Sequence, residues 1–345
     1  MNSFEYASPQ SVRDALSLLA PKWGPTEILA GGTDLVALMK DYVVTPSRLV
    51  NIKKVAGISE VSFTLQKGLR VGALVTLDQL AKHPQVMKNY PTLALAIGDA
   101  ASPQIRNRAT LGGNLCQRPR CWYFRNGYGL LGLDAKGQSL VVKGDNRYHA
   151  ILANDGPAYF VSPSTVAPTL IAYGATVVIQ GAKATRHVPL ANFYLTPTKD
   201  GQREHDLRPN EIVIEVRIPP ASGRTTSYYE VRQKHGFDWP MATATVAVTL
   251  TNNKVQNPMV ILSHVAPVPW RSQEAEAVLT GQSLTPAIAA AAAQAALKPA
   301  KSLGQNGYKI PIARAAVERC ILQVAGLDPL AGVTGYYETR DSLQS

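Results

Sequence analysis

Two pairs of adjacent glycines constrain the fold of this chain more than any other feature of its sequence. The first pair lies in Ala30-Gly31-Gly32-Thr33-Asp34, between a predicted strand over Glu27–Ala30 and the apolar segment Leu35–Met39. The second pair lies in Thr110-Leu111-Gly112-Gly113-Asn114. Adjacent glycines allow positive φ angles and carry no Cβ, so their backbone N–H groups can approach a phosphate directly.

The polar residues beside the glycines favour the same interpretation. Thr33 can donate its hydroxyl to a phosphate oxygen, and we expect Asp34 to cap the helix that follows. Thr110 and Asn114 supply similar groups in the second loop. Neither loop matches G-x-G-x-x-G or the lysine-bearing phosphate loop. One Gly-Gly pair is usually only a turn, but two such loops favour a cofactor that carries phosphate.

Composition excludes several classes of protein. The chain has 345 residues, enough for two domains, and 46% of them are hydrophobic, which is typical of a folded globular protein. No stretch approaches the roughly 20 apolar residues of a membrane span. The 35 basic and 24 acidic residues give a net charge of +11, which suits a basic surface, an anionic cofactor or an acidic partner. No nucleic-acid-binding signature is present, so we expect no nucleic acid partner.

The start of the chain and its cysteines predict a compartment. Met1–Tyr6 has no basic or apolar region of an export signal, and three cysteines do not make a disulfide framework. We therefore expect a cytoplasmic protein. The alternative is a periplasmic protein that is exported together with a signal-bearing partner.

Apolar spacing predicts an α+β arrangement in the first two thirds of the chain. Ser8 and Pro9 predict the start of a first helix, and Thr76 predicts the N-cap of a short helix that ends near Ala81. Another helix is expected over Tyr90–Ala101. The expected strands are Glu27–Ala30, Arg48–Ile52, Leu69–Ala73, Ala175–Gln180 and Glu211–Ile218. The stretch Gly113–Asp155 has no clear periodicity, and loops of that length tend to be functional.

A turn-rich segment, Pro219–Gly223, predicts a domain boundary. Beyond it, strands are expected over 226–232, 242–251 and 259–265, with a turn at Asn252-Asn253, so an antiparallel meander is predicted. Helices beginning at Thr285-Pro286 and covering Ile312–Val324 follow.

Three segments resemble one known family. The run Ser102–Asn114 strongly resembles the flavin loop of the FAD subunits in the xanthine dehydrogenase and carbon monoxide dehydrogenase family. Ile28–Leu35 is similar to that family's first pyrophosphate loop, and Tyr229–Ala242 is similar to the start of its C-terminal domain. The resemblance covers nearly the whole chain in the family's order, and the aldehyde oxidoreductase branch is the most similar.

The resemblance implies an α+β fold with two domains. A bilobal FAD-binding domain of PCMH type, like that of vanillyl-alcohol oxidase, is expected over 1–220, with lobes of about 1–55 and 56–220. A C-terminal domain of the carbon monoxide dehydrogenase flavoprotein type, with a three-stranded antiparallel sheet and a helical bundle, is expected over 224–330. A tail, 331–345, follows.

The resemblance also implies a function in electron transfer. The chain would bind FAD within a molybdenum hydroxylase complex of aldehyde or xanthine type. A molybdopterin-binding large subunit would pass electrons to a ferredoxin-like [2Fe–2S] subunit, and that subunit would pass them to the flavin. The electrons would then leave to an external acceptor such as NAD⁺, a quinone-like carrier or oxygen. No residue of the chain is expected to be catalytic, and it is expected not to hydroxylate a substrate by itself.

Two other functions stay open at this point. One is a self-contained FAD-dependent oxidoreductase, which would need an acid or base such as Tyr148, His149 or His235. The other is a cofactor-free scaffold on the same fold.

The resemblance implies a set of cofactor-binding residues. The first loop is expected to hold the pyrophosphate and the second loop the neighbouring ribityl chain, and Ile105 is expected to pack against the isoalloxazine ring. For Ser102, Arg106 and Lys234, a structural hydrogen bond or a solvated charge is the alternative. Thr165 stands where the family commonly has an aspartate near the flavin, so the flavin potential or acceptor preference is expected to differ. The complete set is Leu29, Ala30, Gly31, Gly32, Thr33, Asp34, Leu35, Ser102, Ile105, Arg106, Thr110, Gly112, Gly113, Asn114, Thr165 and Lys234.

Cys116 and Cys121 follow the second loop in a stretch that resembles the aldehyde oxidoreductase branch, where cysteines of an insertion hold a [4Fe–4S] cluster. That cluster needs four thiolates, and residues 126–144 contain no cysteine. Cys320 is expected to be buried in the last helix. We therefore expect neither a cluster nor a metal ion, and Cys116 and Cys121 are expected to be reduced thiols. A disulfide between them is the alternative outside the cytoplasm.

Overall fold

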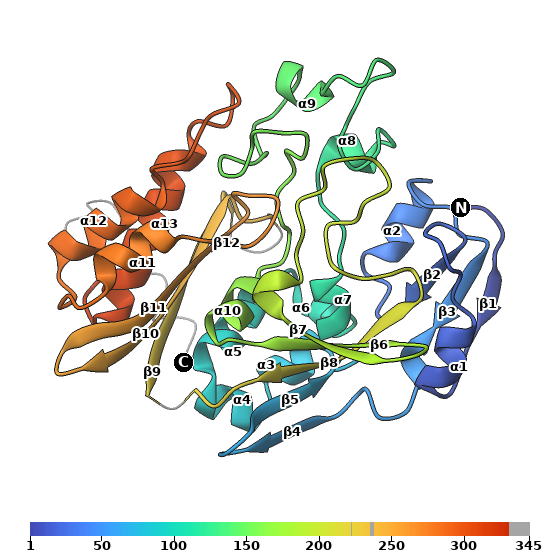
Figure 1. Ribbon diagram of the computed structural model, residues 1–345, viewed down its shortest axis with the longest axis horizontal. Coiled ribbons are helices and arrows are strands. Elements are labelled where there is room, and N and C mark those ends of the chain that lie inside the picture. Colours follow the sequence, from blue (N-terminus) through green and yellow to red (C-terminus); the bar gives the residue numbers. More distant parts are fainter. Residues whose placement is uncertain (222, 235–237, 331–345) are drawn as a thin grey trace.

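The structure is a computed structural model, and it describes residues 1–330 except for 222 and 235–237. It contains three β-sheets with helices packed around them (Figure 1), which confirms the predicted α+β fold class. The predicted tail, 331–345, and His235 lie outside the described residues.

The first sheet is parallel and consists of three short strands in the order β1-β3-β2, with bounds β1 Glu5–Ala7, β2 Thr26–Leu29 and β3 Arg48–Asn51. The helices α1 (Val12–Ser17) and α2 (Leu35–Lys40) connect them, because parallel neighbours need a crossover. The helix start predicted at Ser8 and Pro9 is wrong. Ser11 is the N-cap, since its side chain accepts the Asp14 N–H at 3.1 Å.

The second sheet is antiparallel and pairs residues that lie far apart in the chain. Its order is β4-β5-β8-β6-β7, with bounds β4 Val61–Thr64, β5 Gly68–Gly72, β6 Thr176–Gly181, β7 Thr185–Pro189 and β8 Glu211–Ile218. Leu69 on β5 faces Ile218 on β8 across the ladder. β1, β4 and β7 were not predicted, because all three are short strands at sheet edges with few buried residues.

Short helices pack on the second sheet and bring the second glycine loop to its surface. Thr76 caps α3 with the full capping box, as predicted. The helix predicted over Tyr90–Ala101 is α5. The elements of this layer are α3 Leu77–Ala81, α4 Pro84–Asn89, α5 Pro91–Asp99, α6 Pro103–Arg106, α7 Leu111–Leu115, α10 Val166–Ala172 and the 3-10 turn η2 Leu190–Asn192. A further 3-10 turn, η1 Ile52–Lys54, follows β3 and contacts β2 of the first sheet.

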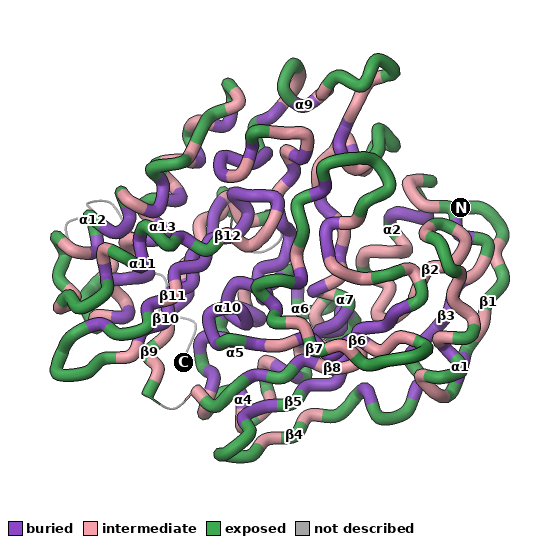
Figure 2. Tube along the Cα trace, viewed as in Figure 1, coloured by how far each residue is buried: buried purple, intermediate pink, exposed green. Residues whose placement is uncertain are grey.

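Residues 116–155, which we call the extension, contain little regular structure. They include only the short helices α8 (Trp122–Arg125) and α9 (Leu140–Lys143), which lie beyond the edge of the sheets in Figure 1. Figure 2 shows exposed residues gathered in the chain around α9. A small apolar cluster packs Leu131 of the extension against Ala158 and Phe160. The predicted long loop is therefore an ordered part of the fold.

The third sheet confirms the predicted antiparallel meander. Asn252 and Asn253 form its tight turn with φ angles of 51° and 59°, the left-handed values that asparagine tolerates in two-residue hairpins. A two-residue strand and one short helix, α11, were not predicted. The elements are β9 Arg224–Val231, β10 Ala242–Thr251, β11 Lys254–Ser263, β12 Trp270–Arg271, α11 Gln273–Leu279, α12 Pro286–Ala296 and α13 Lys309–Val324, and the sheet order is β12-β11-β10-β9.

Candidate functional site

The two glycine loops line one cavity. The first loop connects β2 to α2, and the second begins at Thr110, the N-cap of α7. Residues 30–35 of the first loop and Thr110, Gly112 and Gly113 of the second lie on the wall of a cavity of about 170 Å³. The fold thus brings together two motifs that are about eighty residues apart in the sequence.

The first glycine pair is required by close packing and by backbone conformation. A Cβ on Gly31 would overlap the carbonyl oxygen of Arg108 and lie 2.8 Å from its carbonyl carbon. Gly32 has a φ of +78°, which residues with a side chain rarely adopt. Gly31 therefore lets the first loop touch the backbone just before the second, and Gly32 turns the chain into α2.

The backbone N–H groups differ between the loops. In the first loop, those of Gly31, Gly32, Thr33 and Asp34 donate no hydrogen bond to any described residue. They are available to an anionic ligand.

In the second loop the N–H groups are already used. Leu111 donates to the Val75 carbonyl at 2.9 Å and Gly112 to the Ala73 carbonyl at 2.9 Å. Gly113 donates to Thr110 Oγ1 at 3.1 Å. The second loop therefore contributes mainly the hydroxyl of Thr110, which donates no hydrogen bond to the described residues, and a wall of backbone without side chains.

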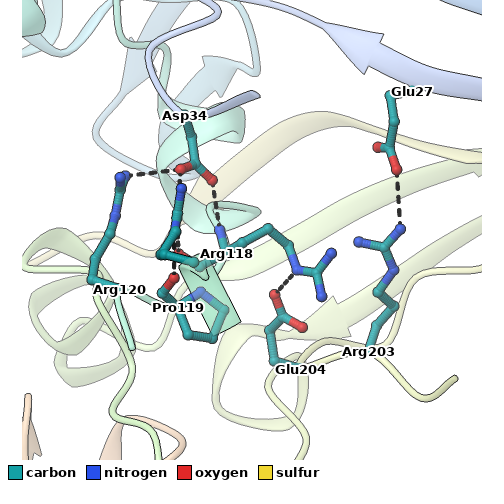
Figure 3. Close-up of polar contacts among 8 residues, drawn as sticks. Glu27, Asp34, Arg118, Pro119, Arg120, Arg203 and Glu204 are labelled. Carbon is teal, nitrogen blue, oxygen red and sulfur yellow. Dashed lines mark hydrogen bonds and ion pairs between the residues drawn. The ribbon is translucent and has the colours of Figure 1, made fainter. Parts of the chain in front are cut away.

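Asp34 does not cap α2, which corrects the prediction. Its side chain makes no capping hydrogen bond. Instead its Oδ2 accepts the backbone N–H of Arg118 at 2.8 Å, and its Oδ1 lies 2.8 Å from Arg125 Nη2 and 3.1 Å from Arg120 Nη2 (Figure 3). All three groups belong to residues that follow the second loop in the chain, and together they occupy both carboxylate oxygens. Asp34 thus ties the first loop to the extension.

Two buried ion pairs that were not predicted place Glu27, Arg118 and Arg203 on the cavity wall. Arg203 pairs with Glu27 at 3.1 Å and stacks 4.3 Å above the ring of Trp23. Arg118 pairs with Glu204 (Figure 3). All four charged side chains are largely buried. The sequence shows a local cluster of basic residues, Arg118, Arg120 and Arg125, just after the second loop. The charged run Arg203-Glu204-His205 is a second signal, which nothing in the sequence connects to either glycine pair.

His205 is the most unusual residue of this wall. It is 5% exposed, stacks on Phe193 with ring centroids 5.5 Å apart, and lines the cavity. Neither ring nitrogen has a hydrogen-bond partner of ordinary geometry among the described residues. Burial lowers the pKa of His205 below its ordinary value, so the ring is neutral near pH 7. Buried polar atoms of this kind usually have partners, so a ligand would satisfy them.

Several predicted residues lie outside this cavity. Ser102 caps α6 by accepting the Ile105 N–H at 3.3 Å, and Arg106 Nη1 donates to the carbonyls of Ala100 and Ala101 at 3.0 Å. Ser102 and Arg106 therefore make the structural hydrogen bonds that were given as the alternative to flavin binding. Ile105 is 43% exposed on the surface of α6.

The remaining predicted residues are also outside the cavity. Asn114 Oδ1 accepts the hydroxyl of Ser164 at 2.7 Å, which joins α7 to the segment before α10. Thr165 is 5% exposed at the start of α10 and makes no capping hydrogen bond. Lys234 is exposed, and Leu29 ends β2. The first loop and three residues of the second thus line one cavity, and the other predicted residues do not line it.

The cysteines do not gather. Cys116 lines the cavity of the glycine loops, whereas Cys121 lies 3.2 Å from His149 Nε2 in a different cavity. Cys320 is fully buried in α13, as predicted. All three are free thiols, and burial raises the pKa of Cys116 to about 12 and also raises that of Cys121. In the described residues no three His, Cys, Asp or Glu side chains could hold a metal ion.

Two protein-family models match the chain. The model for the FAD binding domain in molybdopterin dehydrogenase matches residues 2–221, and the model for the CO dehydrogenase flavoprotein C-terminal domain matches residues 227–324. No helix within the described part of the chain has the length and apolar character needed to cross a membrane.

Individual proteins agree with these models. The aldehyde oxidoreductase FAD-binding subunit PaoB of Escherichia coli (strain K12) is 33% identical over 282 residues, covering 81% of this chain and 87% of that protein. The carbon monoxide dehydrogenase medium chain of Hydrogenophaga pseudoflava is 29% identical, covering 92% and 96%. A solved structure of the carbon monoxide dehydrogenase from that organism superimposes with a TM-score of 0.72 at 28% identity, covering 94% of this chain and 98% of the other.

Proposed function

Because the chain belongs to the family of FAD-binding subunits of molybdopterin dehydrogenases, we propose that it carries electrons through FAD within a molybdenum hydroxylase complex. A molybdopterin-binding large subunit oxidises the substrate, and a [2Fe–2S] subunit passes the electrons to FAD. An external acceptor then takes the electrons from FAD. Relatives named as FAD-binding subunit and medium chain support this role. The observation that carries the proposal is the single cavity lined by both glycine loops.

The residues of this cavity fit FAD. The four free N–H groups of the first loop can receive the pyrophosphate. Arg118 and Arg203 line the same cavity, each paired with a glutamate. The ring nitrogens of His205 have no hydrogen bond of ordinary geometry with the described residues and can contact a polar part of the cofactor. The enclosed volume of about 170 Å³ accommodates part of the cofactor. FAD supplies the ring that exchanges electrons, and this chain binds it, orients it and sets its electrostatic surroundings.

The remaining assignments are part of the same proposal. We place a domain boundary near residue 220, which the two adjoining family matches support. We place the complex in the cytoplasm, because three free thiols suit a reducing compartment. The chain itself hydroxylates no substrate.

The test is reconstitution of the purified full chain with FAD. We expect one FAD per chain and a flavin spectrum without an iron–sulfur shoulder. The loaded chain should oxidise neither aldehydes nor purines unless partner subunits are added. Turnover of either substrate by the chain alone would contradict the subunit role, and a chain that cannot take up FAD would contradict the cofactor assignment.

A further inference from the structure

A second cavity lies where the extension meets the C-terminal sheet. Its volume is about 310 Å³, roughly twice the ~150 Å³ of an engineered apolar cavity that binds benzene. Its walls come from the extension, from residues 160–163 and from the region of the third sheet and α13, and they include none of the predicted flavin-binding residues. The cavity has room for a ligand of about two fused rings.

Four aromatic rings line this cavity, and they suit a planar ligand. They are Trp122 and Tyr148 of the extension, Phe160 and Trp239. Trp122 and Tyr148 meet edge to face with centroids 5.5 Å apart, and Trp239, 48% exposed, lies at the mouth. The Arg120 guanidinium stacks 4.7 Å above Trp239. Offset or edge-on contacts with such rings favour a flat aromatic molecule.

Two polar atoms in the wall lack a hydrogen bond of ordinary geometry within the described part of the chain. Arg120 Nε and His149 Nδ1 are buried and make no hydrogen bond of ordinary geometry with the described residues. Arg120 Nε is always a donor. Because His149 Nε2 faces Cys121 Sγ at 3.2 Å, His149 Nδ1 can carry the ring proton and donate as well. Arg120 Nε has no acceptor among the described residues, and the contact of the His149 side chain with the Asn146 backbone falls short of ordinary hydrogen-bond geometry. These two donors indicate a ligand with acceptor oxygens.

Lys309 holds the walls of this cavity together. Its Nζ donates to the carbonyls of Tyr148 and His149 at 3.2 Å and of His264 at 2.7 Å. All three protons of the ammonium group are thereby used. Lys309 thus fixes the extension to the end of β11, and the ligand must be recognised by the remaining groups.

The two cavities share a wall. Arg120 lines the second cavity and pairs at 3.1 Å with Asp34, which lines the first. A ligand in the second cavity is therefore separated from the first glycine loop by one ion pair. The described lining residues of the second cavity include no glycine that would let the backbone approach a pyrophosphate. This argues against a dinucleotide acceptor there.

We propose that the second cavity binds a quinone, a planar ring with two carbonyl oxygens, as the electron acceptor of the complex. The acceptor role rests on the proposed FAD function. The quinone would take up two electrons and two protons from the reduced flavin and leave as the hydroquinone, and the flavin would return to its oxidised form. Trp122, Tyr148, Phe160 and Trp239 enclose the ring, and Arg120 and His149 donate to its oxygens.

The test measures binding rather than turnover. Oxidised, FAD-loaded full chain is titrated with 1,4-naphthoquinone and, separately, with NAD⁺, by quenching of tryptophan fluorescence and by calorimetry. We expect saturable binding of the quinone and none of NAD⁺. Trp239→Leu should weaken quinone binding about tenfold, consistent with the ~1 kcal/mol of an aromatic contact. Arg120→Lys keeps a positive charge beside Asp34 but removes the Nε donor, and should weaken quinone binding by about fivefold. Tyr128→Leu, an exposed change on the extension away from the cavity, is the control and should have no effect.

Several outcomes would overturn this proposal. Unchanged quinone affinity in both Trp239→Leu and Arg120→Lys would place the quinone elsewhere. Quinone binding to the FAD-free chain that FAD abolishes would show that the cavity belongs to the flavin site. FAD content is measured on the same samples, so a chain that binds FAD but no quinone contradicts only this inference. A chain that binds quinone but no FAD contradicts the proposed function and the acceptor role, while the quinone site remains.

Discussion

The two glycine loops have similar sequences, but they contribute differently to the cavity that they share. The first leaves four backbone N–H groups without an acceptor in the described protein, and it is held from outside by Asp34, on which the backbone N–H of Arg118 and the side chains of Arg120 and Arg125 converge. The N–H groups of the second loop donate to the carbonyls of Ala73 and Val75, just after β5, and to the hydroxyl of Thr110. The N–H groups of the first loop are therefore available to an anion, whereas those of the second are used within the protein.

Gly31→Val should break this pairing of the loops most severely. The new side chain would overlap the Arg108 carbonyl, so one of the two loops must move. Overpacking costs about 1–3 kcal/mol and more where backbone is displaced, and we expect FAD affinity to fall by about 100-fold or more. Calorimetric titration of the FAD-free variant measures this.

The control is Gly98→Ala, since nothing lies within 4 Å of a Cβ at that position in α5. Alanine is the better helix former, so this variant should keep wild-type FAD affinity and gain up to about 1 kcal/mol of stability. If Gly31→Val bound FAD as tightly as Gly98→Ala, the close contact between the loops would have no part in the site.

Sequence reasoning found what was encoded locally. The strand Glu211–Ile218, the cap at Thr76 and the Asn252-Asn253 turn were all predicted, because each depends on neighbouring residues. The meeting of the two glycine loops was not predicted from spacing, and it came only from resemblance to a family. Local rules also misled, because Ser8 was a reasonable cap but Ser11 offers its hydroxyl at the helix start.

The missed parts of the site depend on long-range contacts. Asp34 was expected to cap α2. Only the folded extension brings the Arg118 N–H and the side chains of Arg120 and Arg125 to its carboxylate. His205 belongs to a loop whose sequence gives no sign that it faces either glycine pair. The second cavity takes its walls from separate segments between Arg120 and Lys309. No periodicity or motif within one segment predicts that these separate segments meet in the folded chain.

Asp34→Asn should sharpen the comparison by releasing the external support of the first loop. The asparagine can still accept the Arg118 N–H, but Arg120 and Arg125 lose their counter-charge in a largely buried setting. Removing one partner of a buried ion pair costs about 3 kcal/mol. Urea unfolding of the FAD-free chain measures the loss.

Two variants bracket that result. Asn114→Ala removes the corresponding contact of the second loop, a neutral hydrogen bond to Ser164, and should cost about 1 kcal/mol. Asp155→Asn breaks the exposed pair with Lys301 and should change nothing measurable. Equal losses for Asp34→Asn and Asn114→Ala would mean that the two loops are supported alike.

Thr110→Ala should have the smallest effect and tests what the second loop contributes. The hydroxyl of Thr110 caps α7 by accepting the Gly113 N–H, and its own proton is free to donate into the cavity. Loss of the cap should cost about 1 kcal/mol of stability, and loss of one neutral hydrogen bond to the cofactor should weaken FAD binding about fivefold. Thr76→Ala removes an equivalent cap from α3, which does not line the cavity, so it should lower stability by a similar amount and leave FAD affinity unchanged. Calorimetry with FAD and urea unfolding on both variants separate the two contributions. If Thr110→Ala lost stability but kept its affinity, the second loop would support the first without touching the cofactor through this hydroxyl.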